Sequence, residues 1–144
     1  MRIETWMKHP VHSAKPRDSI LHARKLMEQQ RVNQLPVVVD GRLVGIVTDR
    51  DLRDAFPSAL EPPRCRAGAR QHGPDPAAVP VEDVMTTNVL TLGPRDLVLD
   101  AARLMRRERI GALPIVDDTR LVGILTRSDL LDALVASVPA ARAG

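Results

Sequence analysis

Two short polar steps in the sequence carry residue types that could bind a ligand. The step from Thr48 to Asp51 and the step from Thr126 to Asp129 each follow an apolar run, and they lie 78 residues apart. Residues three apart in the first turn of a helix can direct both side chains to one ligand. A threonine hydroxyl donates and accepts hydrogen bonds, and an aspartate carries two acceptor oxygens, which suit a vicinal diol such as a ribose. Both steps therefore predict a site for a sugar-containing ligand.

Phosphate binding is predicted at the same two steps. The start of a helix offers free backbone amides and the positive end of the helix dipole, both of which favour phosphate. Arg50 and Arg127 lie inside the two steps and could reach such a phosphate. The alternative is that each Thr-x-x-Asp step only caps a helix. Its recurrence after Gly-Ile at a constant spacing favours the binding function, although capping stays open.

The two steps belong to two copies of one longer segment. Residues 5–54 align with residues 83–132 without gaps, and 23 of the 50 positions are identical. Such self-similarity indicates an internal duplication. Each copy reads as β-α-β-β-α, and a unit of that size buries too little surface to be stable alone. We therefore expect an α+β fold in which two β-α-β-β-α repeats pack sheet against sheet with pseudo-two-fold symmetry and form related clefts.

The elements that position the polar steps follow from the apolar pattern. Apolar residues at helical spacing predict helices over residues 18–31 and 96–109, with Asp18 and Asp96 as N-caps. Short β-branched runs predict strands over 35–39 and 43–47, joined by a turn at residues 40–41, and helices follow over 49–55 and 128–138. Gly45 and Gly123 lie inside predicted strands, where glycine lowers stability, so we expect another segment to approach the backbone there.

The domain organisation follows from the repeat and from local composition. We expect repeat 1 over residues 1–55, a Pro/Arg-rich linker over 56–78, repeat 2 over 79–138 and a flexible tail over 139–144. Six of the twelve prolines fall between residues 56 and 81, which is typical of an irregular connection. The linker could alternatively dock on a partner or cover a pocket.

Bulk composition excludes several classes of protein. Trp6 and Phe56 are the only aromatic residues, so the chain lacks the stacking platform of single-strand nucleic-acid binders. The net charge of +3 is mild, and nucleic acid is an unlikely partner. Cys65 is the only cysteine, which excludes an intrachain disulfide and fits a reducing compartment. With no signal-peptide pattern and no membrane-spanning apolar run, the expected location is cytoplasmic.

Other chemically capable residues are better explained by ordinary roles. His9 and His12 have no further metal ligands beside them, so no metal site is expected. The simplest role for Trp6 is packing against other apolar residues. The simplest role for the arginines between residues 103 and 109 is to form a solvated helix end. No nucleophile–base pair, P-loop or dinucleotide motif is present. We therefore expect no enzymatic activity.

Leu35–Val38 and Leu43–Leu52, together with their second copies, resemble the CBS domain, named after cystathionine β-synthase. Two such domains in tandem resemble a Bateman module, here of a stand-alone type. The resemblance implies a regulatory module that binds an adenosine-containing nucleotide: AMP, ADP, ATP, S-adenosylmethionine, NAD or a cyclic dinucleotide. It also implies a homodimer formed through helices, an unknown regulated protein as partner, and no required cofactor.

The resemblance also assigns nucleotide-binding roles to positions in both copies. Polar Gln34 corresponds to Ala112, so the two sites need not be equivalent. A dimeric scaffold without a ligand and a nucleic-acid-associated regulator remain as alternatives. Together with the two arginines of the polar steps, the predicted nucleotide-binding residues are Val11, Ser13, Gln34, Leu35, Pro36, Thr48, Arg50 and Asp51 in the first copy, and Val89, Thr91, Ala112, Leu113, Pro114, Thr126, Arg127 and Asp129 in the second.

Overall fold

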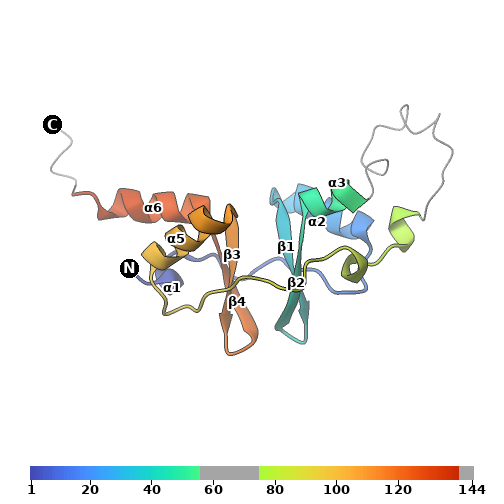
Figure 1. Cartoon of the computed structure of the whole chain (residues 1–144), viewed down its shortest axis with the longest axis horizontal. Coiled ribbons are helices and arrows are strands. Elements are labelled where there is room, and N and C mark those ends of the chain that lie inside the picture. Colours follow the sequence, from blue (N-terminus) through green and yellow to red (C-terminus); the bar gives the residue numbers. More distant parts are fainter. Residues whose placement is uncertain (56–74, 140–144) are drawn as a thin grey trace. The chain divides into compact units, whose positions relative to one another are not determined.

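The protein contains two compact units, each built from helices around a β-hairpin (Figure 1). The structure is a computed structural model that describes residues 1–55 and 75–139. We call residues His12–Val89 the β1–β2 unit, and Met1–Val11 with Leu90–Gly144 the β3–β4 unit. The mixed helix-and-sheet class expected from the sequence is confirmed. The pseudo-two-fold packing of the two copies stays a prediction.

The β1–β2 unit follows the expected order of elements except at its start, where the first expected strand is reduced to an isolated bridge between Ala14 and Val37. It contains α2 (Ile20–Gln30), β1 (Gln34–Val39), β2 (Arg42–Thr48) and α3 (Asp49–Ala55), followed by the short 3-10 helices η2 (Pro76–Ala78) and η3 (Val81–Asp83). The two strands pair antiparallel, with Gln34 opposite Thr48. The turn between them has positive φ at Asp40 and Gly41, as the Asp-Gly pair predicts.

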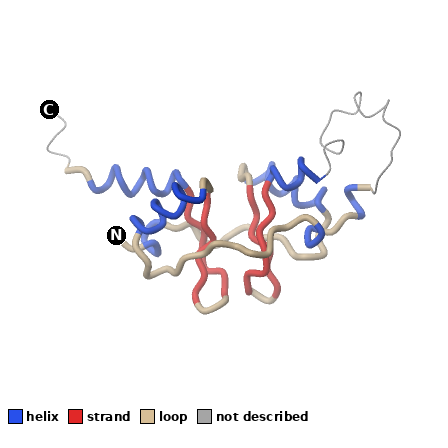
Figure 2. The backbone as a smooth tube through the Cα atoms, in the orientation of Figure 1, coloured by secondary structure: helices blue, strands red, loops and turns tan. Residues whose placement is uncertain are grey.

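The β3–β4 unit repeats this arrangement. It contains α1 (Ile3–Trp6), α5 (Val98–Glu108), β3 (Ala112–Asp117), β4 (Arg120–Thr126) and α6 (Arg127–Ser137). Ala112 pairs with Thr126 across its hairpin. In each unit the long helices lie toward the open end of the hairpin, away from its turn (Figure 2). The open end is therefore where strand, helix and polar step meet.

The segment that leads into each sequence copy belongs to the compact unit of the other copy. Ile3 donates its amide to Asp96 O at 2.9 Å, and its side chain is fully buried in the β3–β4 unit. Val81 likewise donates to Asp18 O at 2.7 Å and is fully buried in the β1–β2 unit. Figure 1 shows α1 beside α5 and α6. The compact units therefore differ from the expected contiguous blocks 1–55 and 79–138, because these leading segments complete the cores of the other copies.

The two hydrophobic cores are aliphatic and use equivalent positions. Burial of this apolar area is the main stabilising contribution. The buried members are Ala14, Ile20, Ala23, Met27, Leu35, Val37, Val47, Leu52, Val79 and Val81 in one unit, and Ile3, Val98, Ala101, Met105, Leu113, Ile115, Leu125 and Ala133 in the other.

The helix ends confirm some sequence expectations and correct others. Both long helices end where predicted, because Arg31 and Arg109 adopt the left-handed conformation directly after α2 and α5. The predicted N-cap Asp18 is wrong by one residue, since the Ser19 hydroxyl caps α2 by accepting from the His22 amide. Asp96 does not cap α5 either; its carboxylate accepts from Gly93 N at 2.7 Å within the preceding turn.

Several expectations concern residues that the structure does not describe. Most of the proposed linker, residues 56–74, lies outside the described residues, as do Cys65 and the tail from residue 140. At the end of the proposed linker, residues 75–78 belong to the described part of the chain, and Asp75 caps η2 by accepting from Ala77 N.

Candidate functional site

The first polar step is a strand-to-helix junction held by two reciprocal hydrogen bonds. Thr48 is the last residue of β2, and Asp51 lies in the first turn of α3. The Thr48 amide donates to Asp51 Oδ2 at 2.9 Å, and the Asp51 amide donates to Thr48 Oγ1 at 3.0 Å. The pair therefore caps the helix, as the structural alternative predicted. Capping also fixes the orientation of the carboxylate, which a binding site requires.

The second polar step has the same geometry. Thr126 precedes α6, its amide donates to Asp129 Oδ2 at 2.8 Å, and its hydroxyl lies 3.0 Å from the same oxygen. The Asp129 amide donates back to Thr126 Oγ1 at 3.4 Å. Asp129 is the buried charged residue among those described, with only 3% of its surface exposed. A buried carboxylate requires several hydrogen-bond donors, and this one has them.

The two steps differ at the Oδ1 oxygen of the aspartate. Lys8 Nζ lies 2.5 Å from Asp129 Oδ1. Within residues 1–55 and 75–139, neither a hydrogen bond nor an ion pair reaches Oδ1 of Asp51. The residue equivalent to Lys8 is Thr86, which pairs its backbone with Ile46 just before Thr48. Neither Lys8 nor Thr86 is predicted as a site residue from the sequence, although both directly follow a methionine that recurs in the two copies.

The residues predicted to contact an adenine lie beside these junctions. Gln34 is opposite Thr48, and Ala112 is opposite Thr126, at the open ends of the two hairpins. The side chains of Leu35 and Leu113 are fully buried in the cores, so only their backbone can face a ligand. Pro36 and Pro114, which follow them, are also buried.

The early extended segments run beside the first strand of each hairpin. Ala14 forms a parallel bridge with Val37, and Leu92 forms one with Ile115. Ser13 and Thr91, the neighbours of these bridging residues, are thereby carried to the strands that bear the other predicted residues. Of the remaining assigned residues, Val11 belongs to the β3–β4 unit and Val89 to the β1–β2 unit.

The two arginines inside the steps are exposed and make local contacts. Arg50 Nε lies 3.7 Å from Asp54 Oδ2, an (i, i+4) pair in which both side chains are largely solvated. Such exposed pairs contribute little to stability. The guanidinium of Arg127 lies over Gly111, where a Cβ would be 3.5 Å from Arg127 Cζ. Neither arginine is committed to a buried partner among the described residues.

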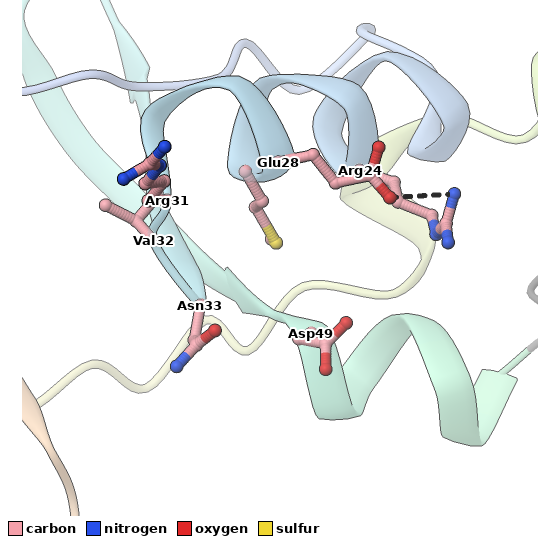
Figure 3. Close-up of a pocket in the computed structure, with 7 residues that line it drawn as sticks. Arg24, Glu28, Arg31, Val32, Asn33 and Asp49 are labelled. Carbon is pink, nitrogen blue, oxygen red and sulfur yellow. Dashed lines mark ion pairs between the residues drawn. The ribbon is translucent and has the colours of Figure 1, made fainter.

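A cavity of about 390 Å³ lies elsewhere on the β1–β2 unit, between α2 and the start of α3 (Figure 3). Its size falls within the range of small-molecule sites. Arg24 and Glu28 on its wall form an ion pair at 3.2 Å. None of the predicted site residues lines it. The lining residues are Arg24, Met27, Glu28, Arg31, Val32, Asn33 and Asp49.

Other candidate chemistry finds little support in the described part of the chain. Among those residues no group of three or more His, Cys, Asp or Glu side chains is placed to hold a metal ion. Within the same residues, no helix combines the length and apolar character needed to cross a bilayer. Arg103 and Arg107 on α5 pair with acidic neighbours on their own helix at 4.0 and 3.1 Å.

Comparison with known proteins decides the family. The model of the CBS domain matches residues 3–58 and again residues 81–136. The chain belongs to the CBS-domain family. The two matched segments are the two copies found by internal alignment, so the resemblance seen in the sequence is confirmed.

Relatives and solved structures agree with this assignment. A CBS domain-containing protein of Dictyostelium discoideum is 40% identical over 118 residues, covering 78% of this chain and 77% of its own. The chain is also similar to inosine-5'-monophosphate dehydrogenase of Korarchaeum cryptofilum, at 32% identity, but it spans only 23% of that enzyme's length.

Two similar structures contain adenosine compounds. The structure of CBSX2 in complex with AMP superposes with a TM-score of 0.76 at 30% identity, covering 94% of this chain and 96% of that one. The CBS domain pair of protein MJ0100, in complex with 5′-methylthioadenosine and S-adenosyl-L-methionine, has a TM-score of 0.75 at 28% identity and covers 96% and 98% of the two chains. CBS pairs of this size therefore include nucleotide-binding members.

Proposed function

We propose that this CBS pair is a regulatory sensor of adenosine-containing nucleotides that signals to a partner protein by a conformational shift. The observation that carries the proposal is the Thr-Asp junction, which occurs at the same place in both units. In the first junction, capping uses Oδ2 of Asp51 and leaves Oδ1 as an oriented acceptor for ribose hydroxyls. A fixed carboxylate binds a diol without first losing side-chain entropy.

The ligand class rests on two lines of support. The junction offers acceptors for a sugar and, at the start of the eleven-residue helix α6, donors for a phosphate. The similar proteins CBSX2 and MJ0100 are described with AMP and with S-adenosyl-L-methionine. We therefore place AMP, ADP, ATP, S-adenosylmethionine, NAD and cyclic dinucleotides in the candidate set. Signalling further requires that the ligand bind two conformations unequally.

A homodimer formed through α6 is part of the proposal. Leu131, Leu134 and Val135 on this helix, and Val138 at its C-cap, are each more than half exposed although they are apolar. Exposed apolar patches on a soluble protein usually mark an interaction surface. A second copy of the chain supplies an identical apolar helix, so the two faces would cover each other.

A thermal-shift panel tests the sensor function. Purified protein is heated with each candidate nucleotide at a hundredfold excess over its Kd, where one bound ligand adds about 2.7 kcal/mol to the free energy of unfolding. GMP is the control for recognition of the adenine base. The double variant Asp51→Ala, Asp129→Ala is the control for binding at the two junctions. We expect at least one adenosine compound to raise the melting temperature of the parent and not of the double variant.

A dimeric scaffold without a ligand is the second candidate, favoured by the same apolar face of α6. The scaffold predicts a stable dimer and no response to any compound in the panel. If no adenosine compound shifted the parent, the sensor proposal would fail and the scaffold would replace it.

A further inference from the structure

Lys8 occupies the carboxylate that the second site would offer to a ribose. Its Nζ lies 2.5 Å from Asp129 Oδ1, while Oδ2 of the same carboxylate accepts from the Thr126 amide at 2.8 Å. Both oxygens of Asp129 are therefore engaged. The Lys8 side chain is 59% exposed and the Asp129 side chain is 5% exposed, so a solvated cation reaches inward to a buried anion.

The backbone of Lys8 is fixed at this position. Its amide donates to Ile124 O at 2.8 Å, and the Ile124 amide donates back to Lys8 O at 3.0 Å. Ile124 lies two residues before Thr126, so the lysine side chain starts next to the junction. The flexible four-carbon stem can then turn its ammonium toward Asp129 or away from it.

The equivalent position in the other unit carries no charge. Thr86 makes the same backbone pair with Ile46, with both hydrogen bonds at 2.9 Å, but its side chain is short and neutral. The residue directly after the junction threonine is also more positively charged at the Asp129 junction, since Asp49 in the first copy corresponds to Arg127 in the second. The two junctions thus share their Thr-Asp geometry and differ in the charge around it.

We propose that Lys8 makes the Asp129 site selective for phosphate-bearing adenosine ligands over neutral nucleosides. This inference rests on the proposed function. Oδ2 of Asp129 already accepts from the amide and the hydroxyl of Thr126, so a ribose diol needs both acceptor positions of Oδ1. Binding of the diol therefore displaces the ammonium, which then lacks the anion that balanced it. A phosphate on the same ligand supplies a new anion and forms charge-assisted hydrogen bonds with Lys8. A neutral nucleoside offers no such replacement and therefore competes poorly with the lysine.

The Asp51 site should have a different preference. No cation of the described residues has to leave Asp51 Oδ1 before a ribose binds. Thr86 also cannot provide a charged partner for the phosphate. Adenosine and AMP should therefore differ less in affinity at the Asp51 site than at the Asp129 site.

Isothermal titration with AMP and adenosine tests the proposal one site at a time. The Asp51→Ala variant isolates the Asp129 site, and the Asp129→Ala variant isolates the Asp51 site. In the Asp51→Ala background we expect AMP to bind about tenfold or more tightly than adenosine, which corresponds to about 1.4 kcal/mol. Adding Lys8→Thr should weaken AMP binding, tighten adenosine binding, and reduce the preference to about threefold or less.

Two further variants separate charge from shape. Lys8→Met keeps an unbranched stem and removes the ammonium, so it should behave as Lys8→Thr does. Thr86→Lys in the Asp129→Ala background should raise the preference for AMP at the Asp51 site. Thermal unfolding of each variant without ligand checks that the fold is retained.

The outcomes discriminate between the inference and the function on which it rests. If Lys8→Thr left the AMP-to-adenosine ratio unchanged, or tightened both ligands equally, the selectivity proposal would be overturned while nucleotide binding stood. If the parent protein bound neither AMP nor adenosine nor any other compound of the panel, the proposed function would fail, and the role of Lys8 would fall with it.

Discussion

The side chain of Met7 lies directly against the backbone of Gly123. A Cβ on this glycine would be 2.5 Å from Met7 Sδ and 3.1 Å from Lys8 O. Met85 covers Gly45 in the same way, with its Sδ at 2.6 Å and Thr86 O at 3.0 Å from the equivalent Cβ. The glycines inside β2 and β4 thus admit the segment that carries Lys8 or Thr86 to each junction.

Replacing either glycine with alanine should therefore destabilise the protein. In Gly45→Ala and Gly123→Ala the new methyl group meets a backbone oxygen as well as a methionine, so the bridging segment must move. Overpacking of this kind costs about 1–3 kcal/mol, measurable by urea unfolding. Gly93→Ala is the control, because the nearest atom to its Cβ would be 3.6 Å away. Equal stabilities for all three variants would contradict the close approach.

The junction aspartates should each support one binding event. In a titration with the best ligand of the panel, Asp51→Ala and Asp129→Ala should each reduce the number of occupied sites from two to one. Each variant should also lose about 1 kcal/mol of stability with its helix cap. Asp54→Ala and Asp132→Ala are matched controls, because they remove exposed carboxylates at equivalent positions of the two copies. If both junction variants retained two sites of parental affinity, the assignment would be wrong.

The N-terminal segment should stabilise the second repeat. Ile3 is fully buried in the core of the β3–β4 unit, so Ile3→Ala should lower the free energy of unfolding by about 2–5 kcal/mol. Thr5→Ala, at an exposed position two residues later, should change it little. Hydrogen exchange should show the loss of protection in α5 and β4. An Ile3→Ala protein as stable as the parent would show that α1 does not complete this core.

The α6 face should control association. Leu134 and Val135 are 59% and 73% exposed, so the double variant Leu134→Asp, Val135→Asp should fold normally while placing charges in the proposed dimer contact. Sedimentation velocity should find the parent as a dimer and the variant as a monomer. Arg106→Asp, which changes an exposed charge on α5, is the control for charge alone. Dimers that persisted in the double variant would assign association to another surface.

Much of the fold could be predicted because local sequence signals agree with the final packing. Asp40-Gly41 favours the positive φ angles of the hairpin turn, and the structure has both. The junction pairs Thr48–Asp51 and Thr126–Asp129 were found from spacing alone, and the capping alternative holds in both. The spacing of apolar residues and the residue types of a turn are local properties, so they can be identified from the sequence alone.

The remaining features depend on contacts between distant parts of the chain. Nothing near Lys8 in the sequence indicates that its ammonium meets Asp129, which lies 121 positions later. The repeat alignment places Ile3 beside its own copy, whereas the structure buries it with the other one. Ser19 and not Asp18 caps α2 because the helix begins at Ile20, the first residue of its apolar pattern, which places the cap one residue after Asp18.

The assignment of α1 to the β3–β4 unit has a consequence for synthesis of the chain. The ribosome releases residues 12–89 long before it reaches Leu125, whose side chain is buried in the same core as Ile3. Ile3 therefore cannot reach its native core until the strands that carry Leu113, Ile115 and Leu125 have been translated. In the newborn chain, this side chain has to wait for partners that are synthesised more than a hundred residues later.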